Sequence, residues 1–184
     1  MKMPPFDYAC PTTLSEAIAL LSAHDGDAKV LAGGQSLVPI LAFRLAAPKL
    51  LVDLRKLTDL RAIKITPDGV TLGAMVRWCD IESDARLRTA HPLLVAAIAH
   101  VAHYQIRNRG TVGGSIAHAD PAAEMPGIAM TCEAEIAVIG KAGPRTINSA
   151  RRDSSNSRRR TQDRREHGSQ FGCAYGDFPK AHPG

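Results

Sequence analysis

The fold of this chain is decided at residues 29–37, which read KVLAGGQSL. A short apolar strand ends at Ala32, two adjacent glycines follow, and Ser36 opens a helical pattern. Paired glycines let the backbone adopt φ > 0 and let another group approach it closely. Peptide N–H groups exposed in such a turn, beside the start of a helix, favour an anion-binding site. A tight strand-to-helix turn without a ligand is the alternative interpretation.

Around this loop, residues 1–55 predict a small α/β unit. Thr13 and Glu16 form a capping-box pattern before apolar residues at helical spacing, and Ser36 is expected to cap a second helix that tolerates Pro39 in its first turn. The order β-α-β-turn-α-β is typical of an α/β layer. The expected elements are an extended entry at 6–8, helices at 14–21 and 37–45, and strands at 29–32 and 50–53.

Residues 56–147 predict a second unit, and the turn sequence at 66–69 predicts a hairpin within it. The helix expected at 92–103 is apolar nearly all round, so it should be mostly buried. After residue 147 the pattern stops. The expected elements are strands at 62–65, 70–72 and 135–139, and helices at 80–88, 92–103 and 126–132.

A second glycine-rich loop is expected at residues 109–115, and residues 111–124 read TVGGSIAHADPAAE. Hydroxyls at Thr111 and Ser115 flank its paired glycines, while Asp120 and Glu124 can accept hydrogen bonds from a ribose or polyol. Two such loops, separated by a folded stretch, predict two walls of one phosphate site. Neither the Rossmann pattern G-x-G-x-x-G nor the P-loop pattern is present, so a nucleotide cofactor would need another fold.

The charge of the chain is divided unevenly. Residues 1–140 hold 13 Lys and Arg against 14 Asp and Glu, a net charge of −1, and residues 141–184 hold 10 against 4, a net charge of +6. Residues 151–166 contain no apolar side chain, so disorder is expected there. No apolar run reaches the ~18 residues of a membrane span, and the N-terminus lacks the apolar stretch of a signal peptide, which favours the cytoplasm.

The two glycine motifs, at 32–37 and 111–124, resemble those of the FAD-binding medium subunits of the molybdenum hydroxylases, a group that includes xanthine dehydrogenase and aerobic carbon monoxide dehydrogenase. Asp53-Leu54, Leu72-Gly73-Ala74 and Gln105-Ile106-Arg107-Asn108 fit the same pattern. The resemblance covers about residues 3–147. It implies an α+β fold like that of the p-cresol methylhydroxylase flavoproteins, with subdomains at 1–55 and 56–147 clasping FAD and the second one incomplete.

The resemblance also implies roles for single residues. Backbone N–H groups of the first loop would hold the FAD pyrophosphate, the second loop would wrap its other side, Glu124 would bond ribitol or ribose hydroxyls, and Val101 would line the adenine pocket. No catalytic residue and no metal ligand is expected. The implied cofactor-binding residues are Ala32, Gly33, Gly34, Gln35, Ser36, Leu37, Thr111, Val112, Gly113, Gly114, Ser115, Asp120 and Glu124.

In such complexes a molybdopterin-binding large subunit oxidises the substrate and a small subunit carries two [2Fe–2S] clusters. FAD then passes the electrons to NAD⁺, O₂ or a quinone, so the implied function is that of an oxidoreductase subunit whose protein part binds and tunes a cofactor. The four cysteines, at positions 10, 79, 132 and 173, form no C-x-x-C pair for a cluster of their own.

Three interpretations of residues 148–184 remain open. The abrupt change in composition favours a frameshift product, for which the DNA sequence around codons 145–150 is the test. A basic arm that neutralises nucleic-acid phosphates is the second, although no aromatic side chain interleaves the arginines of 151–166 for base stacking. The third is a truncated remnant that no longer binds FAD.

Overall fold

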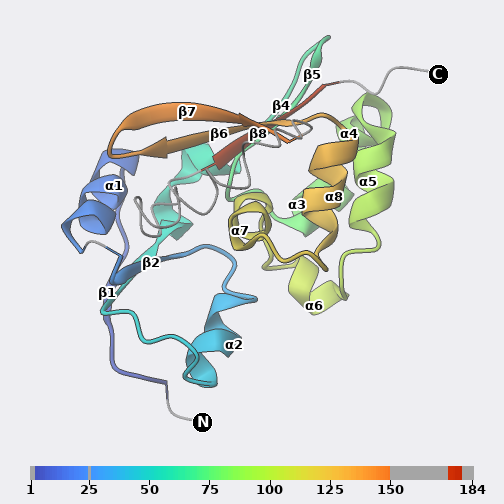
Figure 1. Cartoon of the computed structure of the whole chain (residues 1–184). Helices are drawn as coiled ribbons and strands as arrows, with labels where there is room; N and C mark the ends of the chain where they lie inside the picture. Colours follow the sequence, from blue (N-terminus) through green and yellow to red (C-terminus); the bar gives the residue numbers. More distant parts are fainter. Residues whose placement is uncertain (1–2, 25, 150–173, 180–184) are drawn as a thin grey trace, which may run out of the picture.

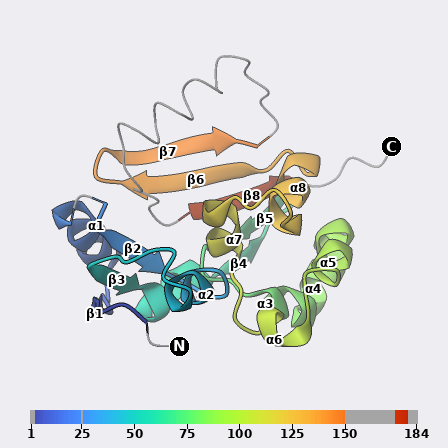
Figure 2. The same ribbon diagram turned by 60° about the horizontal axis from the view of Figure 1, so that its bottom comes forward.

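The structure, a computed structural model, describes residues 3–24, 26–149 and 174–179, and its fold is α+β as expected. A three-stranded parallel sheet and a five-stranded antiparallel sheet form two of its parts, and a group of short helices forms the third (Figures 1 and 2). Helix α7 (Val112–His118) lies in the middle of the molecule in both views. Its position places the second glycine motif between the other parts.

The parallel sheet has the strand order β1-β3-β2, with β1 at Asp7–Ala9, β2 at Ala28–Leu31 and β3 at Leu50–Asp53. Helix α1 (Leu14–Ala23) is capped as expected, because the Thr13 hydroxyl accepts from the Glu16 N–H at 3.2 Å. The Glu16 carboxylate accepts in turn from the Thr12 N–H. The α/β unit predicted from the first 55 residues is therefore confirmed in its strands and in α1.

Helix α2 (Leu37–Ala42) begins where it is predicted but differs in its N-terminal cap and in its C-terminal end. Ser36 stands at the N-cap position but makes no side-chain cap hydrogen bond, so its predicted capping role is wrong. The helix ends three residues before position 45, because Phe43 leaves helical geometry and Arg44 takes a φ of +57°. Two 3₁₀ turns at Leu54–Lys56 and Thr58–Arg61 then lead from β3 to the second sheet.

The antiparallel sheet has the order β4-β5-β8-β6-β7. The predicted hairpin is confirmed as β4 (Ile63–Ile65) and β5 (Gly69–Leu72), and the predicted strand as β6 (Glu135–Gly140). Strand β7 (Gly143–Asn148) has no counterpart among the predicted elements, of which the strand at 135–139 is the last. It forms an edge strand whose residues are mostly exposed, and such a strand shows no apolar alternation in sequence.

The sequence predicts that the pattern of helices and strands stops after residue 147, and strand β8 (Ala174–Pro179) shows that this prediction is wrong for residues 174–179. It pairs antiparallel with β5 on one side and β6 on the other. Backbone pairing explains the difference: β5 and β6 each present unpaired N–H and C=O groups, which a backbone can satisfy whatever its side-chain period. The disorder predicted at 151–166 lies outside the described residues, and so does most of the segment 148–184 that the frameshift and nucleic-acid hypotheses concern.

The helical part also departs from its prediction. The helix expected at 80–88 is two helices, α3 (Trp78–Ser83) and α4 (Ala85–Ala90), because Asp84 is extended and its carboxylate caps the Arg86 N–H at 3.0 Å. Helix α5 (Pro92–Ile98) stops short of residue 103, and a 43% exposed Leu93 shows that it is half-buried rather than buried. Helices α6 (Tyr104–Arg107) and α8 (Glu124–Thr131) follow, the latter starting two residues before its prediction.

The described residues form two main apolar clusters. One lies among the helices and β5, around Trp78, Ile98 and Met125. The other lies on the parallel sheet and includes Leu60 and Met75, which come from beyond residue 55. Residues 73–76 run between the clusters, so they are a fixed backbone against which α7 can pack. No helix in the described part of the chain has the length and apolar character needed to cross a membrane.

The end of β3 carries a buried carboxylate, Asp53, whose side chain is nearly inaccessible. It accepts from the Tyr8 hydroxyl at 2.8 Å, from Arg55 Nε at 2.7 Å and from the Arg55 N–H at 2.9 Å. Burial raises the pKa of Asp53, but the hydrogen bonds from Arg55 and Tyr8 outweigh burial and hold the pKa below its usual range. The same hydrogen bond raises the pKa of Tyr8 to about 12.

We expect Asp53→Asn to lower the free energy of unfolding by about 2 kcal/mol at pH 7, because the charged hydrogen bonds to Arg55 are lost. A lowered folded-state pKa stabilises the protein above the unfolded pKa of about 4, and this contribution is lost as pH falls through the folded value. The difference between variant and wild type should therefore shrink below pH 4. Urea unfolding at pH 7, 5 and 3 measures it.

The matched control is Asp7→Asn, which changes an exposed carboxylate on β1. We expect it to alter the free energy of unfolding by less than about 0.5 kcal/mol at each pH. An Asp53→Asn difference that stays constant down to pH 3 would contradict the assigned role of the charge.

Candidate functional site

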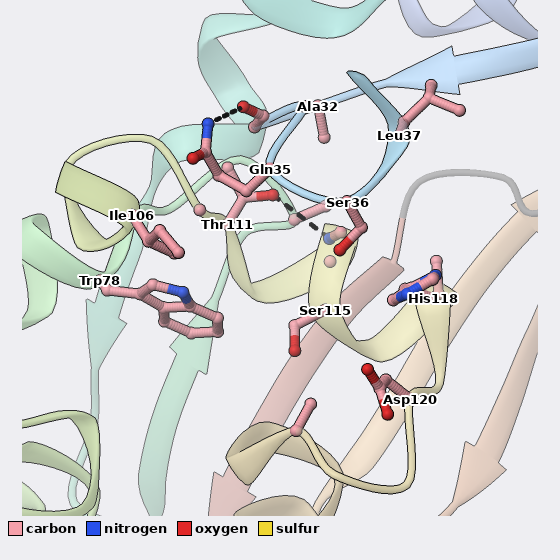
Figure 3. Close-up of a pocket in the computed structure, with 18 of the residues that line it drawn as sticks. Ala32, Gln35, Ser36, Leu37, Trp78, Ile106, Thr111, Ser115, His118 and Asp120 are labelled. Carbon is pink, nitrogen blue, oxygen red and sulfur yellow. Dashed lines mark hydrogen bonds between the residues drawn. The ribbon is translucent and has the colours of Figure 1, made fainter. Parts of the chain in front are cut away.

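A cavity of about 510 Å³ lies between the two glycine motifs. All of the predicted cofactor-binding residues line it except Val112, so the two motifs meet at one site, as the sequence predicts. Val112 is buried, and its N–H donates to Val76 O at 3.0 Å. Figure 3 shows the first loop on one side of this space and α7 on the other.

The first loop presents backbone donors to the cavity. Gly34 has a φ of +73°, a conformation that favours glycine. Among the described residues, no hydrogen bond uses the N–H groups of residues 33–36. The loop is held instead through its carbonyls, since Gly33 O accepts from Gln35 Nε2 at 3.1 Å and Gly34 O from the Val38 N–H at 3.0 Å. Four consecutive donors therefore remain for a ligand.

The second motif is not the loop that the sequence predicts. Thr111 is the N-cap of α7, and its hydroxyl accepts from the Gly114 N–H at 3.2 Å. Gly113 N–H donates to Ala74 O at 2.9 Å, and Ser115 N–H donates to Thr111 O at 3.0 Å. The N–H groups of residues 112–115 are thus used within the protein, and this wall offers hydroxyl groups rather than backbone donors.

Close packing explains the glycines of the second motif. A Cβ on Gly113 would lie 2.6 Å from Ala74 Cβ and 2.9 Å from Ala74 O, and a Cβ on Gly110 would lie 2.7 Å from Trp78 Nε1. Gly33 of the first loop meets the same region, because its Cβ would overlap Arg109 O and lie 3.0 Å from Gly110 Cα. The two motifs are therefore in direct backbone contact through Gly33.

Polar side chains gather at one end of the cavity, on α7 and the segment after it. Ser115 and His118 come from α7, which ends at Ala119 with a φ of +52°. The Asp120 carboxylate follows and accepts from the Ala122 N–H at 2.9 Å, and Glu124 begins α8. Figure 3 shows Ser115, His118 and Asp120 near one another. A hydroxyl, an imidazole and two carboxylates are suited to bind sugar or polyol hydroxyls.

Apolar side chains line another part of the cavity, and most of these residues were not predicted as site residues. Trp78 is only 3% exposed and lines the cavity together with Ile106, Ala102 and Val101. Figure 3 shows Trp78 and Ile106 side by side. The sequence held one sign that Ile106 belongs to the site: it lies only four residues before Gly110, at the start of the second glycine motif. A planar aromatic group fits such a wall.

The described residues give no indication of a metal centre. No group of three or more His, Cys, Asp and Glu side chains in this part of the chain is placed to hold an ion. His91 caps α5, where its Nδ1 accepts from the Leu94 N–H at 3.3 Å, and Cys132 is buried, which raises the pKa of its thiol.

Comparison with known families agrees with this geometry. Residues 4–155 match the family model described as the FAD binding domain in molybdopterin dehydrogenase. The match reaches eight residues beyond position 147, where the sequence resemblance was expected to end.

Individual relatives give the same picture. The chain is 43% identical over 141 residues to caffeine dehydrogenase subunit beta of Pseudomonas sp. (strain CBB1), covering 73% of this chain and 48% of that protein. It is 40% identical over 144 residues to the carbon monoxide dehydrogenase medium chain of Hydrogenophaga pseudoflava, covering 78% and 50%. It therefore spans about half the length of these relatives.

A solved structure of quinoline 2-oxidoreductase from Pseudomonas putida 86 superposes with a TM-score of 0.85 at 36% identity. The superposition covers 99% of this chain and 61% of that one. A structure of carbon monoxide dehydrogenase from Hydrogenophaga pseudoflava gives a TM-score of 0.84 at 31% identity. These likenesses support the α+β fold over the whole described part of the chain.

Proposed function

The chain belongs to the family of FAD-binding domains of molybdopterin dehydrogenases, and from this premise we propose that it binds FAD in the cavity between Gly33 and α7. The observation that carries the proposal is that residues 33–36 line a cavity of about 510 Å³ while their four N–H groups have no hydrogen-bond partner among the described residues. When bound, FAD supplies the electron-transfer chemistry. The chain's own residues bind it and orient it.

We assign the FAD pyrophosphate to the first loop. Its N–H groups and the Ser36 hydroxyl are donors without a partner among the described residues, and a diphosphate is the acceptor that such a turn favours. The close contact of Gly33 with the main chain of residues 109–110 leaves no room for a side chain at position 33. The predicted role of the second motif changes accordingly: Gly113 and Gly114 fix α7 in place, and the hydroxyls of Thr111 and Ser115 are the donors of this motif.

The other parts of FAD are assigned by chemistry. Asp120 and Glu124 suit ribitol or ribose hydroxyls, and the apolar wall that includes Trp78 and Ile106 suits one of the two aromatic rings. The two subdomains predicted at 1–55 and 56–147 then supply one wall each. The site holds the cofactor by shape and hydrogen bonds, and no proton-transfer step is assigned to a side chain.

We propose further that the chain acts as the FAD subunit of a molybdenum-containing oxidoreductase. Several relatives are named as FAD or medium subunits, among them the xanthine dehydrogenase FAD-binding subunit of Escherichia coli O157:H7. A molybdopterin-binding large subunit and a [2Fe–2S] small subunit would be its partners, with NAD⁺, O₂ or a quinone as final acceptor. A cytoplasmic location fits this assignment. The nucleic-acid alternative is not favoured, since the family match covers residues 4–155.

The direct test is a titration of the purified chain with FAD. Trp78 is the only tryptophan and lines the cavity, so bound flavin should quench its emission by energy transfer. Equilibrium dialysis gives the stoichiometry, and we expect one FAD per chain. A folded chain that takes up no FAD would contradict the proposal and support the truncated-remnant interpretation.

A pair of hydroxyl variants separates binding from folding. We expect Ser36→Ala to weaken FAD binding about tenfold, the effect of losing one hydrogen bond to a charged group, while the melting temperature stays unchanged, because Ser36 makes no cap bond. Thr111→Val should instead lower the free energy of unfolding by about 1 kcal/mol through loss of the α7 cap. Calorimetry and the Trp78 titration check both. A Ser36→Ala chain with wild-type affinity would contradict the assignment of its hydroxyl.

A further inference from the structure

The side chain of Arg107 joins segments that form the apolar wall of the cavity, although it does not itself line the cavity. One guanidinium nitrogen, Nη1, donates to Val101 O and to Ala102 O, both at 3.2 Å. Nε lies 2.9 Å from Glu82 Oε1 on α3, in an ion pair whose side chains are 18% and 29% exposed. Arg107 thus connects α3, the turn between α5 and α6, and α6 itself.

Local forces disfavour the shape of the turn that Arg107 holds, because Ala102 has a φ of +43°. A non-glycine residue in this region costs about 1 kcal/mol, so the conformation needs support from its surroundings. The two hydrogen bonds from Arg107 to consecutive carbonyls provide that support. They hold Val101 and Ala102 against the cavity, next to Ile106 of the same helix as Arg107.

We propose that Arg107 is a positioning residue for one aromatic ring of the bound dinucleotide. It fixes the Val101–Ala102–Ile106 side of the wall relative to Trp78 on α3, so that a planar ring meets a preformed surface. The inference rests on the proposed FAD binding and assigns no contact between Arg107 and the cofactor. In this proposal the apolar wall binds an aromatic ring of the cofactor, and the first loop binds the phosphates.

The test compares Arg107→Ala with Arg86→Ala, which removes an exposed arginine paired with Asp84 on α4, away from the cavity. FAD and FMN are titrated separately against each chain by Trp78 emission, and ADP, which contains no flavin to accept the tryptophan energy, by equilibrium dialysis. We expect Arg107→Ala to weaken FAD about tenfold, the size of effect expected from lost charged hydrogen bonds, and Arg86→Ala to leave it unchanged. Either ADP or FMN should weaken in parallel with FAD, and the one that does identifies the ring.

A merely structural role would not produce this asymmetry. If Arg107→Ala weakened the binding of ADP and FMN equally, or did not weaken the binding of FAD, the inference would be overturned. The proposed function would still stand in that case, provided that the wild-type chain bound FAD. A wild-type chain that bound no FAD would overturn both. If Arg107→Ala does not fold, Arg107→Lys and Glu82→Gln replace it, since each removes part of the connection and should give a smaller loss confined to the same half of the dinucleotide.

Discussion

Replacing Gly33 with alanine is expected to weaken FAD binding by about 100-fold, equivalent to about 2.7 kcal/mol. The added Cβ would overlap Arg109 O and would lie 2.9 Å from Arg109 C and 3.0 Å from Gly110 Cα. All three are main-chain atoms, so no side chain can rotate to relieve the clash. The first loop must then move away from residues 109–110, and its N–H groups lose their common direction toward the pyrophosphate. Titration of Trp78 emission with FAD measures the loss.

The matched control for this variant is Gly127→Ala on α8, where a Cβ would meet nothing within 4 Å. We expect unchanged FAD affinity and a free energy of unfolding equal to or up to about 1 kcal/mol above that of the wild type, because alanine is the better helix former. A Gly33→Ala chain that bound FAD as tightly as Gly127→Ala would show that the backbone contact between the motifs does not shape the site.

A chain shortened to end at residue 149 is expected to lose about 3 kcal/mol or more of unfolding free energy and to aggregate, because β8 is removed. In the full chain β8 pairs with β5 from Gly69↔Pro179 to Leu72↔Gly176 and with β6 from Glu135↔Asp177 to Val138↔Ala174. Its loss leaves two facing strand edges without partners and separates the β4–β5 hairpin from β6 and β7. Thermal unfolding and light scattering measure the two effects.

The control removes only residues 180–184, which leaves β8 in place. Its melting temperature should match that of the full chain. If the chain ending at 149 melted at the same temperature as this control, β8 would contribute nothing to stability, and the sheet would have to be regarded as two independent hairpins.

The parts of the fold that the sequence predicts well are those with strong local signals. The residues around KVLAGGQSL combine a strand period, a glycine pair and a helix start, and β2, the loop and α2 lie where expected. The Thr13 cap and the hairpin turn at 66–69 are also local devices with fixed spacing. The sequence predicts that the two motifs meet, although the glycines of the second motif serve close packing rather than phosphate binding.

The parts that the sequence does not predict depend on distant partners. Nothing local indicates that Gly113 N–H donates to Ala74 O, so a helix start was taken for a loop. Trp78 reaches the site only because Gly110 leaves room beside its indole. Strands β7 and β8 owe their conformation to backbone pairing in the sheet. Backbone pairing requires no alternation of apolar and polar side chains, so the sequence gives no sign of it.

The position of β8 has a consequence for the order in which the protein can fold during synthesis. Strand β5 leaves the ribosome early and β6 much later, yet the strand between them follows both in the chain. At translation rates of about 5–20 residues per second, the edges of β5 and β6 stay unpaired for seconds while the residues up to 179 are made. The parallel sheet, complete once Asp53 has emerged, can form well before then. The nascent chain thus has an early-folding half and a half whose open edges need protection from other chains.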